Sequence, residues 1–115
     1  MKSKTIATSL LLALGSLFYS SIASSAVDAD AAQALAKKEG CLKCHGIDKP
    51  KEAKSFKEIA SKLKGKDADA KLLEHLTTGP KVKLQDGSEE DHKMLKTKDK
   101  AEIDNLIAWL RAQAK

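Results

Sequence analysis

The two cysteines of this 115-residue chain stand three positions apart, and a histidine follows the second one directly, in the segment Cys41-Leu42-Lys43-Cys44-His45. Two thiols at this spacing can each form a thioether bond to a vinyl group of one haem, and the adjacent imidazole can then bind the iron. C-x-x-C-H is the attachment signature of c-type haem. It predicts one covalently bound haem c, with Cys41 and Cys44 as the thioether residues and His45 as the proximal iron ligand.

Three other uses of a cysteine pair agree less well with this chain. A thioredoxin-like redox couple needs a βαβ setting, and the sequence contains no convincing strand. A zinc site needs four ligands, and the remaining histidines, His75 and His92, do not form a second ligand pair. A structural disulfide across so short a loop would stabilise little beyond the loop itself.

Residues 1–26 have the layout of a secretory signal peptide. Lys2 and Lys4 precede a largely apolar stretch at residues 6–18, and the small residues Ser24-Ser25-Ala26 are typical of a cleavage site. The alternative is an uncleaved anchor, but the apolar stretch is shorter than the roughly 20 residues that a spanning helix needs. We therefore expect cleavage and no stable membrane insertion afterwards. Covalent haem attachment in bacteria takes place outside the inner membrane, so export agrees with the haem motif and predicts a periplasmic location.

Cleavage would leave residues 27–115 as one small domain. Its only aromatic residues are Phe56 and Trp109. The haem would therefore have to complete the core, and we expect the haem-free chain to be largely unfolded. Loss of Lys2 and Lys4 reduces the 21 basic residues to 19, against 16 acidic ones. This small excess, without interleaved aromatic and basic residues, argues against a nucleic-acid partner.

Apolar spacing predicts four helices and no definite sheet. The first helix covers residues 27–39, with Ala31, Ala34 and Leu35 on its inner face and Gly40 at its end. Three more helices are expected: one between Ser55 and Gly65, one from Asp67 to residues 77–80, and one from about Asp99 to Ala114. Residues 81–98 form the least regular part, and a connection of this length in a small domain is more often functional than idle.

The later helices carry clearer apolar sides than the first. The helix after Asp67 has an apolar side of Ala68, Leu72, Leu73 and Leu76, and the last helix has Ile103, Leu106, Ile107 and Leu110, with Trp109 beside them. Asp99 and Glu102 have the spacing of a capping box. His75 lies among the leucines of its helix, and we expect it to be a surface or partly buried histidine that does not bind the iron.

The chain resembles the small class I cytochromes c of bacteria, of the monohaem c551 and c8 types. The resemblance covers nearly all of residues 28–115 and rests on the haem motif, on residues 47–48 and 55–60, and on the terminal segment at 106–110. It implies an all-α cytochrome c fold of about four short helices wrapped around one covalently attached haem. It also implies single-electron transfer without substrate chemistry, so the protein is not expected to be an enzyme.

The loop after the haem motif departs from the family pattern. The family usually has Gly-Pro before the residues that match Ser55-Phe56, and the proline carbonyl accepts a hydrogen bond from the proximal histidine. Here the matching residues are Ala53-Lys54. Any backbone carbonyl can accept that bond, which orients the ligand and raises its basicity. The rigid proline is lost, however, so the reduction potential is expected to differ from the family norm.

The sixth iron ligand is the second departure. The family usually supplies a methionine followed by prolines, which this chain lacks, and it places that ligand at a set distance before the aromatic residue of the last helix. Counting back from Trp109, His92 lies 17 residues earlier and Met94 lies 15 earlier. The spacing favours His92, whereas the family habit favours Met94. A methionine would raise the reduction potential and a second histidine would lower it.

Together these patterns predict a periplasmic monohaem cytochrome that carries single electrons between redox protein partners. Such partners make small, transient contacts near the exposed haem edge, so we expect a monomer. The alternative is a gas-binding or sensing haem protein, which would need an open or displaceable sixth position on the iron.

Overall fold

The computed structural model of the protein describes residues 26–114. Its elements follow in the order α1 (Ala29–Lys38), the 3-10 turn η1 (Cys41–Lys43), α2 (Phe56–Lys62), α3 (Ala68–Thr78), β1 (Lys81–Lys83), β2 (Glu89–Asp91) and α4 (Lys100–Arg111). All four predicted helices are therefore present. Residues 1–25, which hold nearly all of the expected signal peptide, and Lys115 lie outside the described residues.

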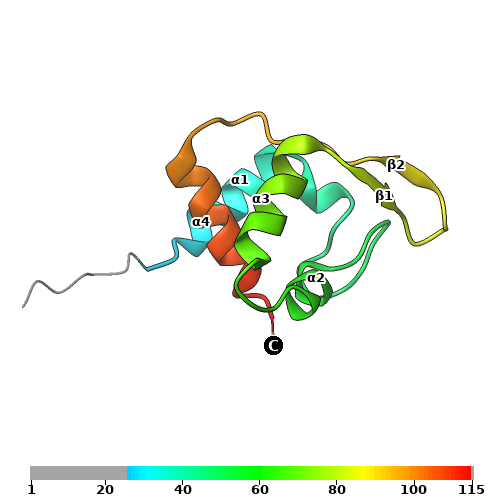
Figure 1. Ribbon diagram of the computed structural model, residues 1–115, viewed down its shortest axis with the longest axis horizontal. Coiled ribbons are helices and arrows are strands. Elements are labelled where there is room, and N and C mark those ends of the chain that lie inside the picture. The colour runs from blue at the N-terminus through cyan, green and yellow to red at the C-terminus, as the bar shows by residue number, and fades with distance from the viewer. Residues whose placement is uncertain (1–25, 115) are drawn as a thin grey trace, which may run out of the picture.

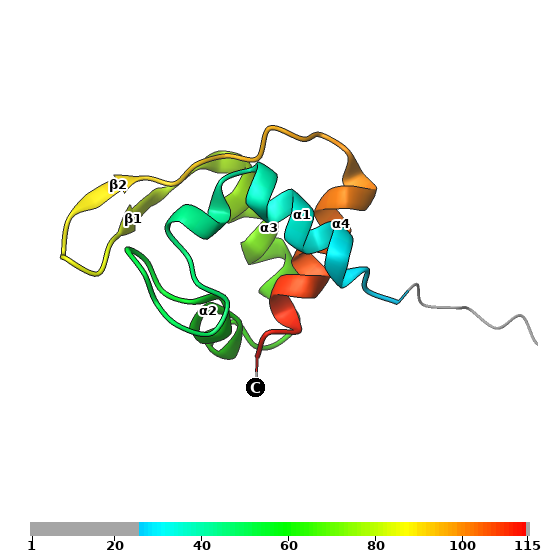
Figure 2. The ribbon, with the colours of Figure 1, turned by 180° about the vertical axis from the view of Figure 1, so that it is seen from behind.

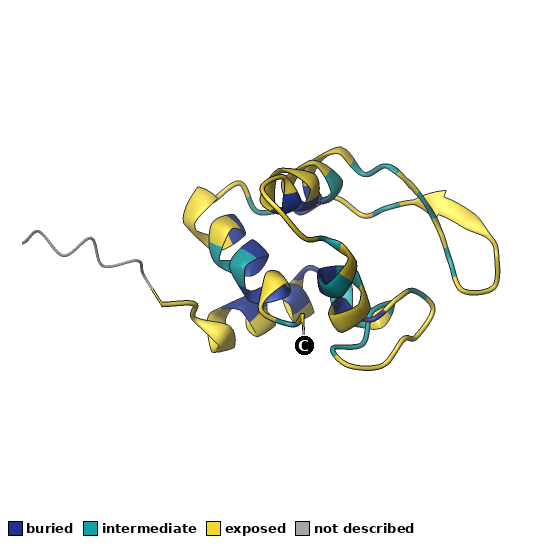
Figure 3. Ribbon diagram, turned by 60° about the horizontal axis from the view of Figure 1, so that its bottom comes forward, coloured by how far each residue is buried: buried dark blue, intermediate teal, exposed yellow. Residues whose placement is uncertain are grey.

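Helix α4 is the element on which the other helices pack, since α1, α2 and α3 each lie against it. The hairpin of β1 and β2 projects from the opposite side of the molecule (Figures 1 and 2). Figure 3 shows that the buried residues lie on the inner sides of the helices, while the hairpin is largely exposed. The core consists of twelve residues: Ala32, Leu35, Ala36, Phe56, Leu72, Leu76, Leu95, Ile103, Leu106, Ile107, Trp109 and Leu110.

The inner face of α1 differs from the predicted one. Ala31 and Ala34 are exposed, and the buried residues of the helix are Ala32, Leu35 and Ala36. The physical reason is that alanines occupy both sides of this helix, so apolar spacing alone does not fix its rotation. The actual buried stripe continues at helical spacing to Glu39, the residue that ends the helix.

One residue of α3 was also assigned to the wrong side. Ala68, Leu72 and Leu76 are buried as predicted, but Leu73 is 43% exposed. Leu72 and Leu73 are neighbours in the sequence and point about 100° apart on a helix, so only one of them can face the core directly. The predicted apolar side of α4 is buried throughout, with Trp109 in the core.

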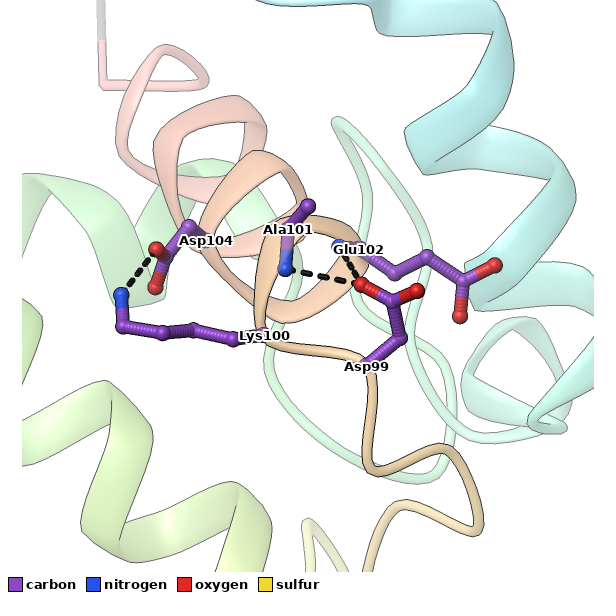
Figure 4. A network of polar contacts seen from close by, with 5 residues as sticks. All are labelled: Asp99, Lys100, Ala101, Glu102 and Asp104. Carbon is purple, nitrogen blue, oxygen red and sulfur yellow. Dashed lines mark hydrogen bonds and ion pairs between the residues drawn. The ribbon is translucent and has the colours of Figure 1, made fainter.

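The start of α4 is capped, but not by the predicted reciprocal box. The Asp99 carboxylate accepts hydrogen bonds from the backbone N–H groups of Ala101 at 2.9 Å and Glu102 at 3.2 Å (Figure 4). The Glu102 side chain does not return to Asp99. It accepts a hydrogen bond from Thr97 Oγ1 at 2.6 Å, and Thr97 Oγ1 in turn accepts one from the Asp99 N–H at 3.2 Å. Thr97 Oγ1 therefore bridges the Glu102 carboxylate and the Asp99 N–H, which bond to each other directly in a capping box.

Residues 81–91 form a two-stranded antiparallel sheet, where the sequence predicts no definite sheet. Lys81 pairs with Asp91, Val82 with Glu90, and Lys83 with Glu89 in the strand register. Opposite charges thus face each other at two of three positions, a pairing that stabilises short strands modestly. Each strand has only three residues, so the apolar alternation is too short to be seen in the sequence.

Within residues 26–114, none of the helices is both long and apolar enough to cross a membrane.

Candidate haem-binding site

A cavity of about 690 Å³ opens beside the C-x-x-C-H segment. Its walls come from that segment, from α2, α3 and α4, and from residues 82–95. The cavity has the size and the apolar lining of a cofactor site, since such sites typically measure a few hundred Å³ or more. All five predicted site residues line it, namely Cys41, Cys44, His45, His92 and Met94, and the structure adds His75 to them.

The chain turns sharply into the cysteine segment at Gly40. This residue has φ of 82°, a left-handed conformation that suits glycine, and it ends α1 as predicted. The 3-10 turn that follows is held by hydrogen bonds to the Cys41 carbonyl from the N–H groups of Cys44 at 3.3 Å and His45 at 3.0 Å. Local geometry therefore places both thiols and the imidazole on one wall of the cavity.

Both cysteines are free thiols. Burial raises the pKa of the Cys41 thiol above its ordinary value. Burial also raises the pKa of the Cys44 thiol, helped by its hydrogen bond to the Glu52 carboxylate at 3.6 Å. No disulfide joins the two cysteines, and both line the cavity.

His45, the predicted proximal ligand, is oriented by a backbone carbonyl. His45 Nδ1 lies 2.6 Å from the Lys54 carbonyl oxygen. A carbonyl can only accept, so Nδ1 carries the proton and Nε2 keeps the free lone pair that a metal requires. The ring also stacks on Phe56, with 5.2 Å between ring centres. The residue that replaces the family's proline therefore provides the hydrogen bond through its main chain, as expected.

A complete capping box fixes this carbonyl in place. Ser55 is fully buried, and its side chain accepts a hydrogen bond from the Glu58 N–H at 3.2 Å. Glu58 Oε2 accepts bonds from the Ser55 N–H at 2.9 Å and from Ser55 Oγ at 3.0 Å. These bonds hold the pKa of Glu58 below its ordinary value. Because Lys54 directly precedes Ser55, the cap of α2 also positions the Lys54 carbonyl oxygen, which accepts the hydrogen bond from His45 Nδ1–H.

His92 faces His45 across the cavity, with 6.2 Å between the ring centres and 45° between the ring planes. An imidazole nitrogen binds a metal ion at about 2 Å, and the ring centre lies about 1 Å further away, so two imidazoles on opposite sides of one ion have centres about 6 Å apart. The observed separation agrees with that value. Burial lowers the pKa of His92, and the nearby His75 and His45 lower it further. The ring is therefore neutral at pH 7, which is the form that binds metals.

One nitrogen of His92, Nδ1, is buried and has no hydrogen-bond partner among the described residues. An unpaired buried polar atom is rare in proteins and commonly marks a missing ligand or water. Met94, the competing candidate, lines the same cavity but is 54% exposed.

His75 is the residue that sequence reasoning underestimated. It is partly buried, as expected, but its ring lies edge-on to that of His92 with only 4.4 Å between the centres. Burial lowers its pKa, and the nearby His45 contributes to the same shift. The available signal was its position between Leu72 and Leu76, which both proved to be buried cavity residues.

The segment carrying His92 is held against the end of α3. The His92 N–H donates to the Pro80 carbonyl at 2.8 Å, and the Leu95 N–H donates to the Leu76 carbonyl at 2.9 Å. Between these bonds, Gly79 has φ of 62°, and a Cβ there would lie 2.7 Å from the His92 carbonyl oxygen. Only glycine therefore permits the close approach of these two segments.

Comparison with known proteins finds a matching family model and similar solved structures. The family model described as Cytochrome c matches residues 29–114. The crystal structure of the class 1 cytochrome MtoD from Sideroxydans lithotrophicus ES-1 is similar with a TM-score of 0.74, at 47% sequence identity, over 78% of this chain and 100% of that one. No curated protein matches the chain.

Proposed function

The chain belongs to the cytochrome c family, and on that premise we propose that it is a periplasmic electron carrier whose single haem is bound by Cys41, Cys44, His45 and His92. The family and the fold establish a small class I cytochrome with covalently bound haem c. The proposal adds the residues, the iron ligation and the cellular location.

In the proposed site the two thiols form the thioether bonds and His45 provides the proximal ligand. The bound haem supplies an iron centre that alternates between the ferric and ferrous states. The chain supplies a fixed environment for that centre. His45 is oriented by the Lys54 carbonyl, and apolar residues such as Phe56, Leu72 and Leu76 exclude water from the cavity. A rigid site favours fast electron transfer, because little rearrangement accompanies the change of charge.

The observation that carries the choice of His92 is its position opposite His45, 6.2 Å away between ring centres. One further signal described above points the same way, namely the unpaired Nδ1 of His92. Two neutral imidazoles stabilise ferric iron relative to a histidine–methionine pair, so the potential is expected to be lower than in methionine-ligated relatives.

The surface around Cys44 suits brief contacts with a redox partner. It carries charges of both signs, with Lys43 and Lys51 exposed beside Glu52 and Glu90. A surface without a strong field of one sign favours brief contacts over tight binding, which a mobile carrier requires. Export through the expected signal peptide would place the protein in the periplasm. There we expect it to act as a monomer.

The test is the absorption spectrum of the haem-loaded, exported protein in both redox states, alongside His92→Ala, Met94→Ala and His75→Ala. Bis-histidine ligation predicts a low-spin ferric spectrum without the far-red methionine–iron band. Only His92→Ala should become high-spin, and His92→Ala combined with His75→Ala excludes replacement by the neighbouring ring. A far-red band lost in Met94→Ala would instead establish methionine ligation. A high-spin wild type would support the gas-binding alternative and overturn the carrier proposal.

A further inference from the structure

We propose that the Glu39 carboxylate positions the sixth iron ligand by holding the segment after His92 against the end of α1. The inference rests on the proposed ligation of the haem by His92. It concerns a residue that carries no part of the haem motif and that the sequence patterns left unassigned.

Glu39 is buried, with 5% of its surface exposed. A buried carboxylate is costly unless it is paired with a base or hydrogen-bonded. No ion pair among residues 26–114 includes Glu39. Its position at the last turn of α1 also opposes the helix dipole, which favours positive charge at that end. Neither an ion pair within the described residues nor the helix dipole therefore stabilises the carboxylate.

The compensation comes from a segment 57 positions away in the chain. Glu39 Oε2 accepts a hydrogen bond from the Lys96 N–H at 2.8 Å, and Oε1 accepts one from the Thr97 N–H at 3.3 Å. Hydrogen bonds to a charged acceptor are stronger than bonds between neutral groups. The two oxygens thus hold two consecutive backbone groups of the same segment.

These bonds connect the two walls of the haem cavity. Glu39 itself lines the cavity and lies two residues before Cys41. Only residues 93–95 separate the bonded Lys96 from His92, and Leu95 within them is buried and bonded to the Leu76 carbonyl. The Glu39 carboxylate therefore links the haem-attachment segment directly to the segment that carries the sixth ligand.

This link should determine how often His92 leaves the iron. Dissociation of the ligand requires its segment to move away from the cavity, and the Glu39 bonds oppose that movement. A well-held segment keeps external ligands off the iron, as an electron carrier needs, and a loosened one admits them. Glu39 is in this sense a positioning residue, since it acts on the iron only through His92.

The experiment measures the rate at which cyanide binds to the oxidised, haem-loaded protein by stopped-flow absorption. Cyanide binds only after the sixth ligand has dissociated. Glu39→Gln replaces one accepting oxygen by an NH2 group, which can only donate, and Glu39→Ala removes both acceptors. Glu39→Gln should accelerate binding about tenfold, and Glu39→Ala more, because charge-assisted bonds are lost. The control Glu74→Gln removes the same charge from an exposed position and should leave the rate unchanged.

The same measurement in a protein that lacks His92 separates positioning of His92 from a general loosening of the fold. In His92→Ala combined with His75→Ala the sixth position is already open, so Glu39→Gln should not accelerate cyanide binding further. Glu39→Asp, which keeps the charge but shortens the side chain, provides a milder variant if the others lose haem, and it should accelerate binding by a smaller factor. Equal rates for Glu39→Gln and Glu74→Gln would overturn the proposal. The proposal would also be overturned if Glu39→Gln accelerated cyanide binding by the same factor in the protein that carries His92→Ala and His75→Ala. Failure of the His92 ligation itself would appear separately, in the spectra of the His92→Ala protein.

Discussion

The two walls of the cavity are built in different ways. The proximal wall, residues 40–55, is held by bonds between residues close in sequence, such as His45 with Lys54 and the Ala53 N–H with the Cys44 carbonyl at 3.0 Å. The distal wall, residues 79–97, is held by bonds that span longer stretches, from Leu95 to Leu76 and from Lys96 to Glu39. A motif of a few residues can therefore specify the first wall but not the second.

The contrast has a consequence for function. Under the proposed ligation, covalent attachment and a local hydrogen bond would make the proximal ligand nearly permanent. The distal ligand depends on the packing of separate elements, and packing can be weakened by a single substitution. The chemistry of the iron is thus most easily altered from the distal side, while loss of the proximal side should remove the haem altogether.

The largest expected effect comes from removing the proximal attachment with Cys41→Ala and Cys44→Ala together. Without thioether bonds the haem should be lost from the exported protein, and the core of residues 26–114, with only two aromatic residues, should not hold the helices. We expect no covalent haem on a denaturing gel and most of the helical circular dichroism to disappear. Met94→Ala is the control that should keep both. A haem-free chain with full helix content would show that the distal wall folds without the proximal one.

An intermediate effect is expected from Gly79→Ala, which acts on the distal wall alone. A non-glycine residue at positive φ costs about 1–2 kcal/mol, and the clash of the new Cβ with His92 should add about 1–3 kcal/mol. The summed cost should lower the free energy of unfolding measured in urea. Cyanide should also bind to the haem-loaded protein faster than in the wild type.

Gly87→Ala is the matched control for Gly79→Ala. Gly87 also has a positive φ, of 87°, but a Cβ there would meet no atom within 4 Å. Gly87→Ala should lower the free energy of unfolding only by the backbone cost, about 1–2 kcal/mol, and should not change the rate of cyanide binding. Equal results for both glycines would show that the contact with His92 does not matter.

The smallest effect is expected from Glu58→Gln, at the cap that holds the Lys54 carbonyl. The pKa of Glu58 is lowered in the folded state from its ordinary value of 4.5, so its ionised form stabilises the fold above that pH. This stabilisation is lost as the pH falls through the lower, folded-state pKa. Glu58→Gln should therefore lower the melting temperature slightly at pH 7, and the difference from wild type should vanish in acid. Glu74→Gln should show no such pattern, and a difference that persists in acid would contradict this explanation.

Much of the proximal wall and of the helix pattern could be predicted from the sequence. The starts of α2 at Ser55 and of α4 at Asp99 and the stop at Gly40 agree with the sequence prediction, because each depends on local side-chain and backbone geometry a few residues apart. The all-α fold and the covalent haem c are confirmed by the family and the structural match. The individual haem-binding residues remain predictions, although the structure brings them to one cavity.

The errors lie where a second element makes the choice. The rotation of α1 was misjudged because alanines occupy several of its sides, and only the contact with α4 selects Ala32 and Ala36. Glu39 was overlooked because a glutamate at a helix end ordinarily faces water. The short hairpin was missed because three-residue strands carry too little pattern, and pairing across the turn defines them.

The sequence by itself determined the haem motif, the fold class and the local geometry around His45, since these depend on spacings of a few residues and on local backbone preferences. It left the sixth ligand open between His92 and Met94. The tertiary structure decided which of them faces His45, because that depends on how the end of α3, the hairpin and Glu39 hold one segment. Contacts between residues distant in the chain set this position, and no short pattern in the sequence records them.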